Sequence, residues 1–348
     1  MAILIDGNNL IQQSFYSTIR ELHDNGDIDK DNLINDYKYI KDDFKAMFFY
    51  QVFNNILSMN KYKANYGNIV VALDSKNSWR RRFYPDYKSR RRNKEKNDNE
   101  QFTSNLLYKF IEIIEKILSH TNIKVLKTMF NSKYGIEGDD IIAVLAMYLQ
   151  DEKHIIYSID VDFYQILNDR IKQYHPLERR IIDTPTKRAV DVKMKTFYLK
   201  GQAKDSVPSI KYQTELSTDF IKFVKKNYEI ELRNDMIDKV IKNHKDIVNH
   251  YKEETEKDIY KKSRFTEDNL KLFFDNLEEM LDTNKYYKHN YKRNLLLLSF
   301  YKIPESVKNK ILEEYESLED IKFLNKIKLR KLFLKAGATK VADMVDQF

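Results

Sequence analysis

Apolar and polar residues alternate in blocks along the first 200 residues, and two kinds of block are present. Short runs that are apolar throughout are typical of buried strands. Longer stretches with apolar positions three or four residues apart predict amphipathic helices. The predicted strands are residues 2–5, 68–73, 123–126, 154–159, 171–174 and 180–182. The predicted helices are residues 43–59, 102–118, 138–148 and 193–199.

This alternation predicts an α/β fold in which a mostly parallel central sheet carries helices on both faces. The strand signal fades after Gly201, and the remaining chain predicts a smaller, all-helical C-terminal region. We therefore expect an α/β domain over residues 1–200 and a helical domain over 201–348. A strongly charged insertion at about 225–292 falls within the second domain.

The amino-acid composition excludes several kinds of functional site. It has 348 residues and no cysteine, which excludes disulfides, thiolate zinc sites, iron–sulfur clusters and cysteine nucleophiles. No apolar run approaches the ~18 residues of a membrane span, and the N-terminal pattern does not match a signal peptide. We expect a cytoplasmic protein that has no membrane partner.

Acidic residues follow the predicted strands where those strands end. In parallel sheets, ligands bind outside the carboxyl ends of the strands, and carboxylates gathered there favour Mg²⁺ or Mn²⁺. Two such ions ~4 Å apart would serve phosphodiester hydrolysis, in a nuclease or a phosphatase. An acid after a strand is also a common turn former or helix cap, so each position keeps that alternative. The candidate ligands are Asp6, Asp74, Glu137, Asp139, Asp140, Asp160, Asp162 and Asp205.

Positive charge is concentrated in one segment. Residues 80–96 hold nine cations and two acids, or 9 − 2 = +7 of the chain's net +8. The sequence WRRRFYPDYKSRRR at 79–92 interleaves these cations with aromatic side chains, which can stack on unpaired bases while the cations contact phosphates. If the segment is helical, Tyr87, Lys88 and Arg91 could share one face. The alternative is a solvated basic face whose aromatic rings pack into the core, but nucleic acid is the favoured partner.

Several motifs occur in a fixed order, namely LIDGNN, VALDS, WRRRFYPDYKSRR, YGIEGDDIIA, SIDVDF and LKGQAKDSVPSI, before the C-terminal LRKLFLKAGATKVADMVDQF. With this series the chain resembles the flap endonuclease/5′-nuclease family, and within it the branch of T-even bacteriophage ribonucleases H. The resemblance implies a PIN/5′-nuclease-like fold and two Mg²⁺ ions, for which Mn²⁺ can substitute. It also implies a 5′→3′ exonuclease and flap endonuclease that removes RNA primers and adjacent DNA during lagging-strand replication. For a phage protein, the compartment would be the host cytoplasm.

The resemblance also implies roles for particular residues. Asp6, Asp74, Glu137 and either Asp139 or Asp140 would hold the first metal, and Asp160, Asp162 and Asp205 the second. The catalytic side chains would be Lys88, Arg91 and Arg80. Lys88 and Arg91 would lie at the base of a basic arch over residues 79–100, with Lys88 on the scissile phosphate, and Arg80 would come just before the arch. The helical region after Gly201 would grip the duplex and bind K⁺. The implied nucleic-acid contacts are Arg81, Arg82, Tyr87, Arg90, Arg92, Lys204 and Lys211.

Two positions depart from the family pattern. Gln202 stands where the family usually has a second-site Asp, and no glycine-rich hairpin follows Pro208. These departures leave open a structure-specific DNA-binding protein with impaired nuclease activity. A PIN-type ribonuclease is a further alternative. The expected partners are branched or nicked DNA and RNA–DNA duplexes with a 5′ end, a single-strand-binding protein and a sliding clamp, with the chain itself a monomer.

Overall fold

The computed structural model describes residues 1–92, 94–149, 152–211, 214–232, 240, 243–255, 270, 273–318 and 324–348. The chain forms two compact units. Unit 1 comprises residues 1–79, 95–185 and 303–348, and unit 2 comprises residues 80–94 and 186–302. This division differs from the predicted boundary near residue 200, because residues 303–348 pack with the α/β core and residues 80–94 pack with the helical region.

Unit 1 is built on a six-stranded sheet in the order β3-β2-β1-β4-β5-β6. The first five strands in sequence run parallel, and only the edge strand β6 is antiparallel to its neighbour. The strands are β1 Ala2–Asp6, β2 Asn68–Ala72, β3 Lys124–Leu126, β4 His154–Tyr157, β5 Ile171–His175 and β6 Arg180–Ile181. Each lies within two residues of its predicted bounds, so the predicted α/β class is confirmed.

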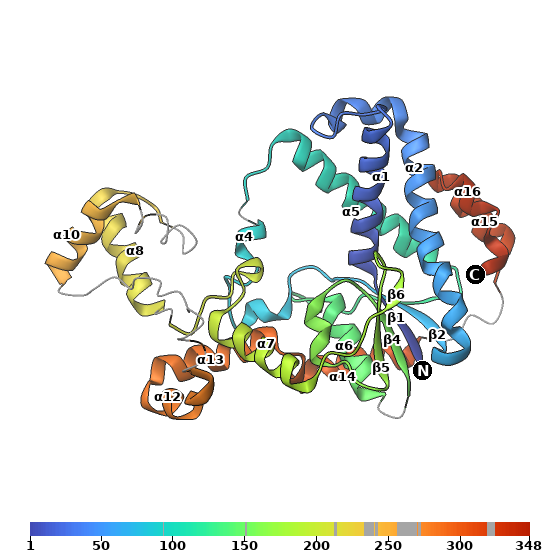
Figure 1. Ribbon diagram of the computed structural model, residues 1–348. Helices are drawn as coiled ribbons and strands as arrows, with labels where there is room; N and C mark the ends of the chain where they lie inside the picture. Colours follow the sequence, from blue (N-terminus) through green and yellow to red (C-terminus); the bar gives the residue numbers. More distant parts are fainter. Residues whose placement is uncertain are drawn as a thin grey trace. The chain divides into compact units, whose positions relative to one another are not determined.

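Helices cover both faces of this sheet (Figure 1). Ile3 and Ile5 of β1 face a core formed with α1 Gly7–Asp24, α2 Leu33–Ser58 and α5 Asp98–Leu118. Helix α6 Gly138–Tyr148 packs on the opposite face, and α14 Glu305–Ser317 packs on α6. A capping box between Asn97 and Glu100 fixes the start of α5. Shorter elements are η1 Met59–Tyr62, α3 Lys63–Tyr66, η2 Trp79–Arg82 and η3 Val161–Gln165.

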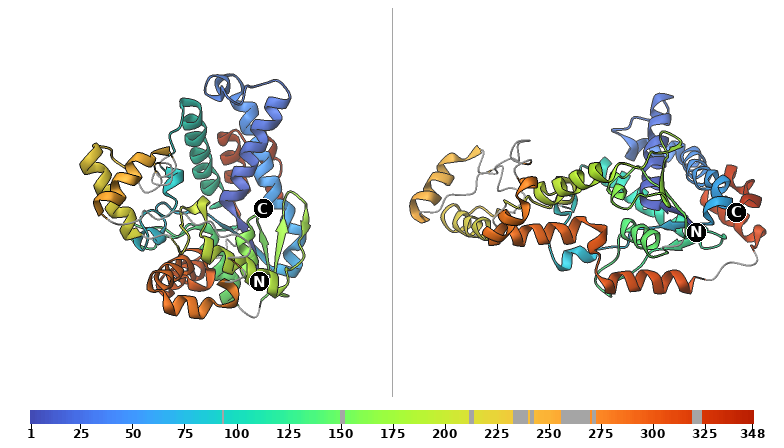
Figure 2. Two further views of the ribbon diagram at one scale, coloured as in Figure 1. Left: turned by 60° about the vertical axis from the view of Figure 1, so that its left-hand side comes forward. Right: turned by 60° about the horizontal axis from the view of Figure 1, so that its bottom comes forward.

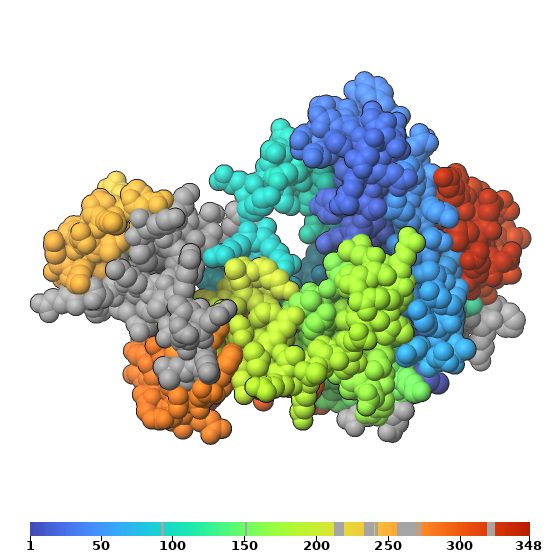
Figure 3. Space-filling model, in the orientation of Figure 1, coloured from blue at the N-terminus to red at the C-terminus, as the bar shows by residue number. Residues whose placement is uncertain are grey.

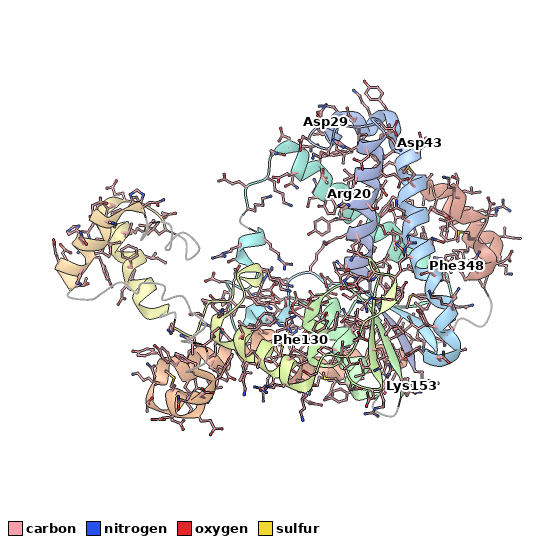
Figure 4. All side chains as sticks on the ribbon, in the orientation of Figure 1. Arg20, Asp29, Asp43, Phe130, Lys153 and Phe348 are labelled. Carbon is pink, nitrogen blue, oxygen red and sulfur yellow. The ribbon has the colours of Figure 1, made fainter. Side chains whose placement is uncertain are left out.

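The C-terminal helices complete the core of unit 1. They are α15 Lys326–Ala336, α16 Thr339–Ala342 and η7 Val345–Gln347, which lie against α2 in Figures 2 and 3. The rings of Phe333 and Phe348 lie 5.0 Å and 5.7 Å from the ring of Phe53 on α2, and Figure 4 labels Phe348 beside that helix. The segment expected to belong to a separate helical domain is therefore part of the α/β unit.

The described residues of unit 2 form helices and no strands. Helices α7 and α13 pack together, and α13 holds the loop after Val207 through Asn290, which donates to Ile210 O at 2.9 Å, and Asn294, which donates to Pro208 O at 3.0 Å. The predicted insertion at 225–292 lies partly outside the described residues. The elements of unit 2 are α4 Ser89–Arg92, α7 Lys187–Lys200, η4 Ala203–Asp205, α8 Thr214–Tyr228, α10 Lys245–Thr255, α12 Leu277–Thr283, α13 Lys285–Leu298 and η6 Phe300–Lys302. Among the helices described in either unit, none has the length and apolar character needed to cross a membrane.

Candidate active site

Asp6 stands at the junction of β1 and α1, at the carboxyl edge of the sheet. Its Oδ1 accepts a hydrogen bond from Asn9 N at 2.9 Å, and its Oδ2 accepts one from Ser158 Oγ at 3.0 Å. The residue is only 6% exposed. Burial, with smaller contributions from the neighbouring carboxylates Asp74 and Asp160, raises the pKa of Asp6 to about 7 against the opposing effect of the two hydrogen bonds. This junction therefore brings together three acids at a cost in electrostatic free energy.

Asp74 follows β2, the neighbour of β1 in the sheet. Its Oδ1 accepts from Gly138 N at 2.8 Å, at the first residue of α6. Its own N–H donates to Asn8 Oδ1 at 2.8 Å, so the amide of Asn8 ties the end of β2 to the start of α1. The side chain is held at the sheet edge and remains exposed to solvent.

Asp160 follows β4, the other neighbour of β1. Its Oδ1 caps η3 by accepting from Asp162 N at 2.8 Å, and its backbone N–H donates to Ser158 Oγ at 3.0 Å. The buried Gln173 on β5 donates from Nε2 to the carbonyls of Ser158 at 2.7 Å and Asp160 at 3.1 Å. The backbone that carries Asp160 and Asp162 is thus fixed by side chains from two strands.

The third group of acids lies at the start of α6. Glu137 is buried, and its Oε2 accepts from Ser78 Oγ at 3.1 Å. Asp140 is completely buried, and its Oδ2 accepts from Trp79 Nε1 at 2.8 Å. Asp139 is partly exposed. Negative charge in this first turn is favourable because the N-terminal end of the helix dipole is positive.

The donor set of unit 1 suits a hard divalent cation, since it consists of carboxylates and the repulsion at Asp6 is a cost that a cation would relieve. Yet no three His, Cys, Asp or Glu side chains among the described residues are placed to hold one ion together. The carboxylates of Asp74, Glu137 and Asp160 instead accept the hydrogen bonds given above.

Asp205, the eighth predicted ligand, belongs to unit 2 and has a different environment. Its Oδ1 forms an ion pair with Arg91 Nη2 at 3.1 Å, and its carbonyl oxygen accepts a hydrogen bond from Lys88 N at 2.8 Å. Arg90 N donates to Ser206 Oγ at 3.0 Å. The turn at η4 therefore anchors the part of the cationic segment that was predicted to act on the substrate.

The expectation that Tyr87, Lys88 and Arg91 share a helical face is wrong. Lys88 has φ +55°, a left-handed conformation that no α-helix contains, and α4 begins only at Ser89. The ring of Tyr87 is buried in an apolar cluster with Val207.

Two of the four aromatic side chains in residues 79–92, Trp79 and Tyr87, are buried and do not present a stacking surface. Trp79 is fully buried, whereas Phe83 is 52% exposed. Arg80 is also buried. Its Nε donates to Leu297 O at 2.8 Å, and its guanidinium lies 5.7 Å from the centre of the Tyr87 ring. The expected stacking of Trp79 and Tyr87 on bases is therefore incompatible with this packing.

The remaining predicted nucleic-acid contacts are mostly at the surface. Arg82, Arg90 and Lys204 are exposed, and Arg81 is partly buried with its Nε donating to Tyr87 O at 3.3 Å. Burial lowers the pKa of Lys211 below its usual value. The side chain of Arg92 lies outside the described residues.

Sequence reasoning missed the polar residues that hold the acids in place. Asn8, Ser158, Gln173 and Ser78 were not singled out, although Asn8 lies two residues after Asp6 in the DGNN motif. The signal that could have found Ser158 is its position two residues before Asp160. The partners of Gln173 and Ser78 are distant in sequence, so no local pattern indicates them.

Three comparisons place the chain among known proteins. The bacteriophage T4 protein named Ribonuclease H is 24% identical over 302 residues, which is 84% of each chain. A bacteriophage T5 protein co-crystallized with metal ions has the same fold, with a TM-score of 0.52 and 15% identity over 90% of this chain and 98% of that one. The model of the family described as 5′-3′ exonuclease, N-terminal resolvase-like domain, matches residues 1–196, more than half of the sequence. The chain therefore belongs to the 5′-3′ exonuclease family and is a 5′ nuclease.

Proposed function

We propose that this 5′ nuclease is a structure-specific 5′→3′ exonuclease and flap endonuclease that requires Mg²⁺, for which Mn²⁺ can substitute. The observation that carries the proposal is the junction at Asp6, where the ends of three adjacent parallel strands supply carboxylates. The family membership and the metal ions in the T5 crystal structure support the same reading.

The carboxylates of unit 1 would hold the cations. These are Asp6, Asp74, Glu137, Asp139, Asp160 and Asp162. Bound divalent cations supply an activated water and stabilise the charge that develops during phosphodiester hydrolysis. Ser158 and Gln173 keep the strand β4 end rigid, so that little reorganisation of the backbone accompanies binding.

The cationic segment would bind substrate phosphates. Lys88 and Arg91 offer charge at a turn whose backbone is pinned to η4, and Arg82 and Arg90 add exposed guanidinium groups. Arg80 is buried, and the hydrogen bond from its Nε to Leu297 O fixes the start of the segment within unit 2. Lys204 and Lys211 lie on the same loop as Asp205 and would extend the contact along a duplex.

The biological substrate that we propose is a branched or nicked DNA or RNA–DNA duplex with a 5′ end, such as an RNA primer with its adjacent DNA. The name of the T4 relative, Ribonuclease H, supports the RNA–DNA part of this proposal. A K⁺ site after Gly201, contacts with a single-strand-binding protein and a sliding clamp, and a monomeric state remain predictions from the family resemblance.

A cleavage assay tests the proposal. The substrates are 5′-labelled flap, nicked and RNA-primed duplexes, together with a single-stranded RNA, each with Mg²⁺ or with EDTA. We expect Mg²⁺-dependent cutting that needs a 5′ end, its loss in Asp160→Asn, and its retention in Asp169→Asn, which changes an exposed acid outside the site.

Two outcomes would favour the alternatives. Binding of flap DNA without cleavage in Mg²⁺ or Mn²⁺ indicates a structure-specific DNA-binding protein. Two observations favour this alternative, namely the ion pair between Asp205 and Arg91 and the glutamine at position 202. Preferential cutting of single-stranded RNA with no need for a 5′ end indicates a PIN-type ribonuclease.

A further inference from the structure

Two acids of the candidate site stand just beyond the hydrogen-bonded part of the sheet. The pairing of β1 with β2 ends at Ala72, two residues before Asp74. The pairing of β1 with β4 ends at Tyr157, three residues before Asp160. The backbone bonds between these strands therefore do not fix the positions of Asp74 and Asp160 relative to Asp6.

Asn8 holds the first of these two acids. The backbone N–H of Asp74 donates to Asn8 Oδ1 at 2.8 Å. Because an N–H can only donate, the oxygen of the Asn8 amide must face it, which fixes the orientation of the side chain. A Cβ on Gly7 would lie 2.8 Å from Ala72 O, so only glycine lets the first turn of α1 approach the end of β2 so closely. The bond therefore ties Asp74 to the helix that Asp6 caps.

Ser158 holds the second acid. Its Oγ accepts from the backbone N–H of Asp160 at 3.0 Å and donates to Asp6 Oδ2 at 3.0 Å. The side chain is completely buried, so water does not compete for either bond. One hydroxyl group thus connects the backbone of Asp160 directly to the carboxylate of Asp6.

These two ties act against an electrostatic repulsion. The carboxylates of Asp74 and Asp160 lie close enough to the buried carboxylate of Asp6 to repel it. If a tie were removed, the loop that carries the acid could relieve this repulsion by moving away. Carboxylates that are spread apart would bind a shared cation less tightly, because side chains that orient metal ligands contribute to metal affinity.

We propose that Asn8 and Ser158 are positioning residues that set the spacing of Asp74 and Asp160 around Asp6, and through it the affinity of the site for divalent cations. The part that concerns cations rests on the proposed function. The part that concerns spacing rests only on contacts within unit 1. Both side chains act through the acids that they hold, and neither is assigned a contact with the substrate.

Hydrogen exchange of single backbone amides, measured by NMR in EDTA, tests the two ties without metal or substrate. Asn8→Leu keeps the approximate shape of the side chain but removes the acceptor, so the amide of Asp74 should exchange about tenfold faster, with no change at Asp160. Ser158→Ala should show the opposite pattern. Asn8→Asp retains an acceptor oxygen and should keep the amide of Asp74 protected. The control Asn54→Asp, which changes an exposed amide on α2, should resemble the wild type.

Calorimetric titration of Mg²⁺ into each metal-free variant measures the consequence for the cation site. We expect Asn8→Leu and Ser158→Ala each to weaken binding about tenfold or more. Asn8→Asp keeps the tie and adds a carboxylate beside Asp74, so it should bind Mg²⁺ at least as tightly as the wild type. Asn54→Asp adds the same charge elsewhere in unit 1 and should leave the affinity unchanged.

Cleavage of a flap substrate separates positioning from substrate contact. In Asn8→Leu, the Mg²⁺ concentration that gives half-maximal rate should rise by about the same tenfold factor. The KM for the flap at saturating Mg²⁺ should match that of the wild type. A side chain that touches the substrate would instead raise KM, and a side chain with a purely structural role would change neither value.

Two results would overturn the proposal. One is an unchanged exchange rate for Asp74 in Asn8→Leu or for Asp160 in Ser158→Ala. The other is faster exchange combined with wild-type affinity for Mg²⁺. If Asn8→Leu loses protection throughout β1 and so fails to fold, Asn8→Ala, which adds no apolar bulk, takes its place with the same expectations.

The outcome for the wild type separates this proposal from the proposed function. A wild-type chain that neither binds Mg²⁺ nor cleaves would refute the proposed function. Hydrogen exchange would still decide whether Asn8 and Ser158 hold the two acids.

Discussion

Replacing Asp6 by Asn should stabilise the metal-free protein at alkaline pH while removing its metal-dependent activity. Asparagine is as good an N-cap as aspartate, and its Oδ1 can keep the bond from Asn9 N. Its amide can donate to Ser158 Oγ once that hydroxyl rotates. The substitution therefore removes a buried charge with little change in shape.

The magnitude follows from the pKa of Asp6, which burial and the nearby Asp74 and Asp160 raise from 3.8 to about 7. The difference between these two pKa values corresponds to about 4 kcal/mol between the protonated and the ionised form of Asp6. Because the folded-state pKa is the higher one, the wild type loses stability as pH rises from about 4 through about 7. Allowing about 1 kcal/mol for the reorganised bond to Ser158, Asp6→Asn should be about 3 kcal/mol more stable at pH 8 and no more stable at pH 4.

Urea unfolding in EDTA, followed by the fluorescence of Trp79 in unit 1, measures this difference at both pH values. Asp169→Asn is the matched control and should show no pH-dependent gain. If the cation binds where we propose, adding Mg²⁺ at pH 8 should stabilise the wild type much more than Asp6→Asn, because the variant lacks one of the proposed carboxylate ligands. An Asp6→Asn variant that is less stable than the wild type at pH 8 would refute the electrostatic reasoning.

Three further predictions concern other parts of the chain. Phe333→Ala should lower the free energy of unfolding in urea by about 3–5 kcal/mol, because the ring is fully buried. Leu334 is half-exposed on the same helix, so Leu334→Ala should lower it far less. Equal losses would contradict the packing of α15 on the core. Arg90→Gln should reduce the slope of log binding constant against log salt by about 0.9 on duplex DNA, and Lys328→Gln, exposed on α15, should leave it unchanged. Asp205→Asn breaks an ion pair to the cationic segment, so amide protons at the start of α4 should exchange faster while those of α6 do not; equal exchange in variant and wild type would show that the pair does not hold the segment.

The central strands β1, β2 and β4 could be predicted because nearly all of their residues are buried, so their sequences are largely apolar. The strands β3, β5 and β6 are partly exposed and give a weaker signal. Helix α1 was not predicted, although the apolar residues Ile11, Phe15, Ile19 and Leu22 recur three or four residues apart. Gly7 and the two asparagines at its start have low helix propensity. Helix α2 begins ten residues before its predicted start, in a polar stretch that gives no amphipathic signal.

The acids could be placed at the sheet edge from sequence because strand ends set their positions. Their partners could not, since Trp79 and Asp140 are separated by 61 residues and Arg91 and Asp205 by 114. Nor does any local pattern reveal the positive φ of Lys88 that ends the predicted helical face. Tertiary contacts decide which side chains each carboxylate meets, and no local pattern reveals them.

The interleaving of the two units along the chain has a consequence for synthesis. The core of unit 1 needs Phe333 and Val341, yet the unit's preceding segment ends at residue 185 and its last begins at 303, 118 positions later. At a translation rate of about 5–20 residues per second, the ribosome needs about 6–24 s to cross that interval. During this time the face of α2 around Phe53 is exposed, because the helices that cover it have not been synthesised. Unit 2 can fold in the same interval. The residues at the carboxylate edge of the sheet are thus synthesised before the C-terminal helices that complete the core beneath them. The nascent chain therefore needs residues 303–348 before unit 1 can fold stably.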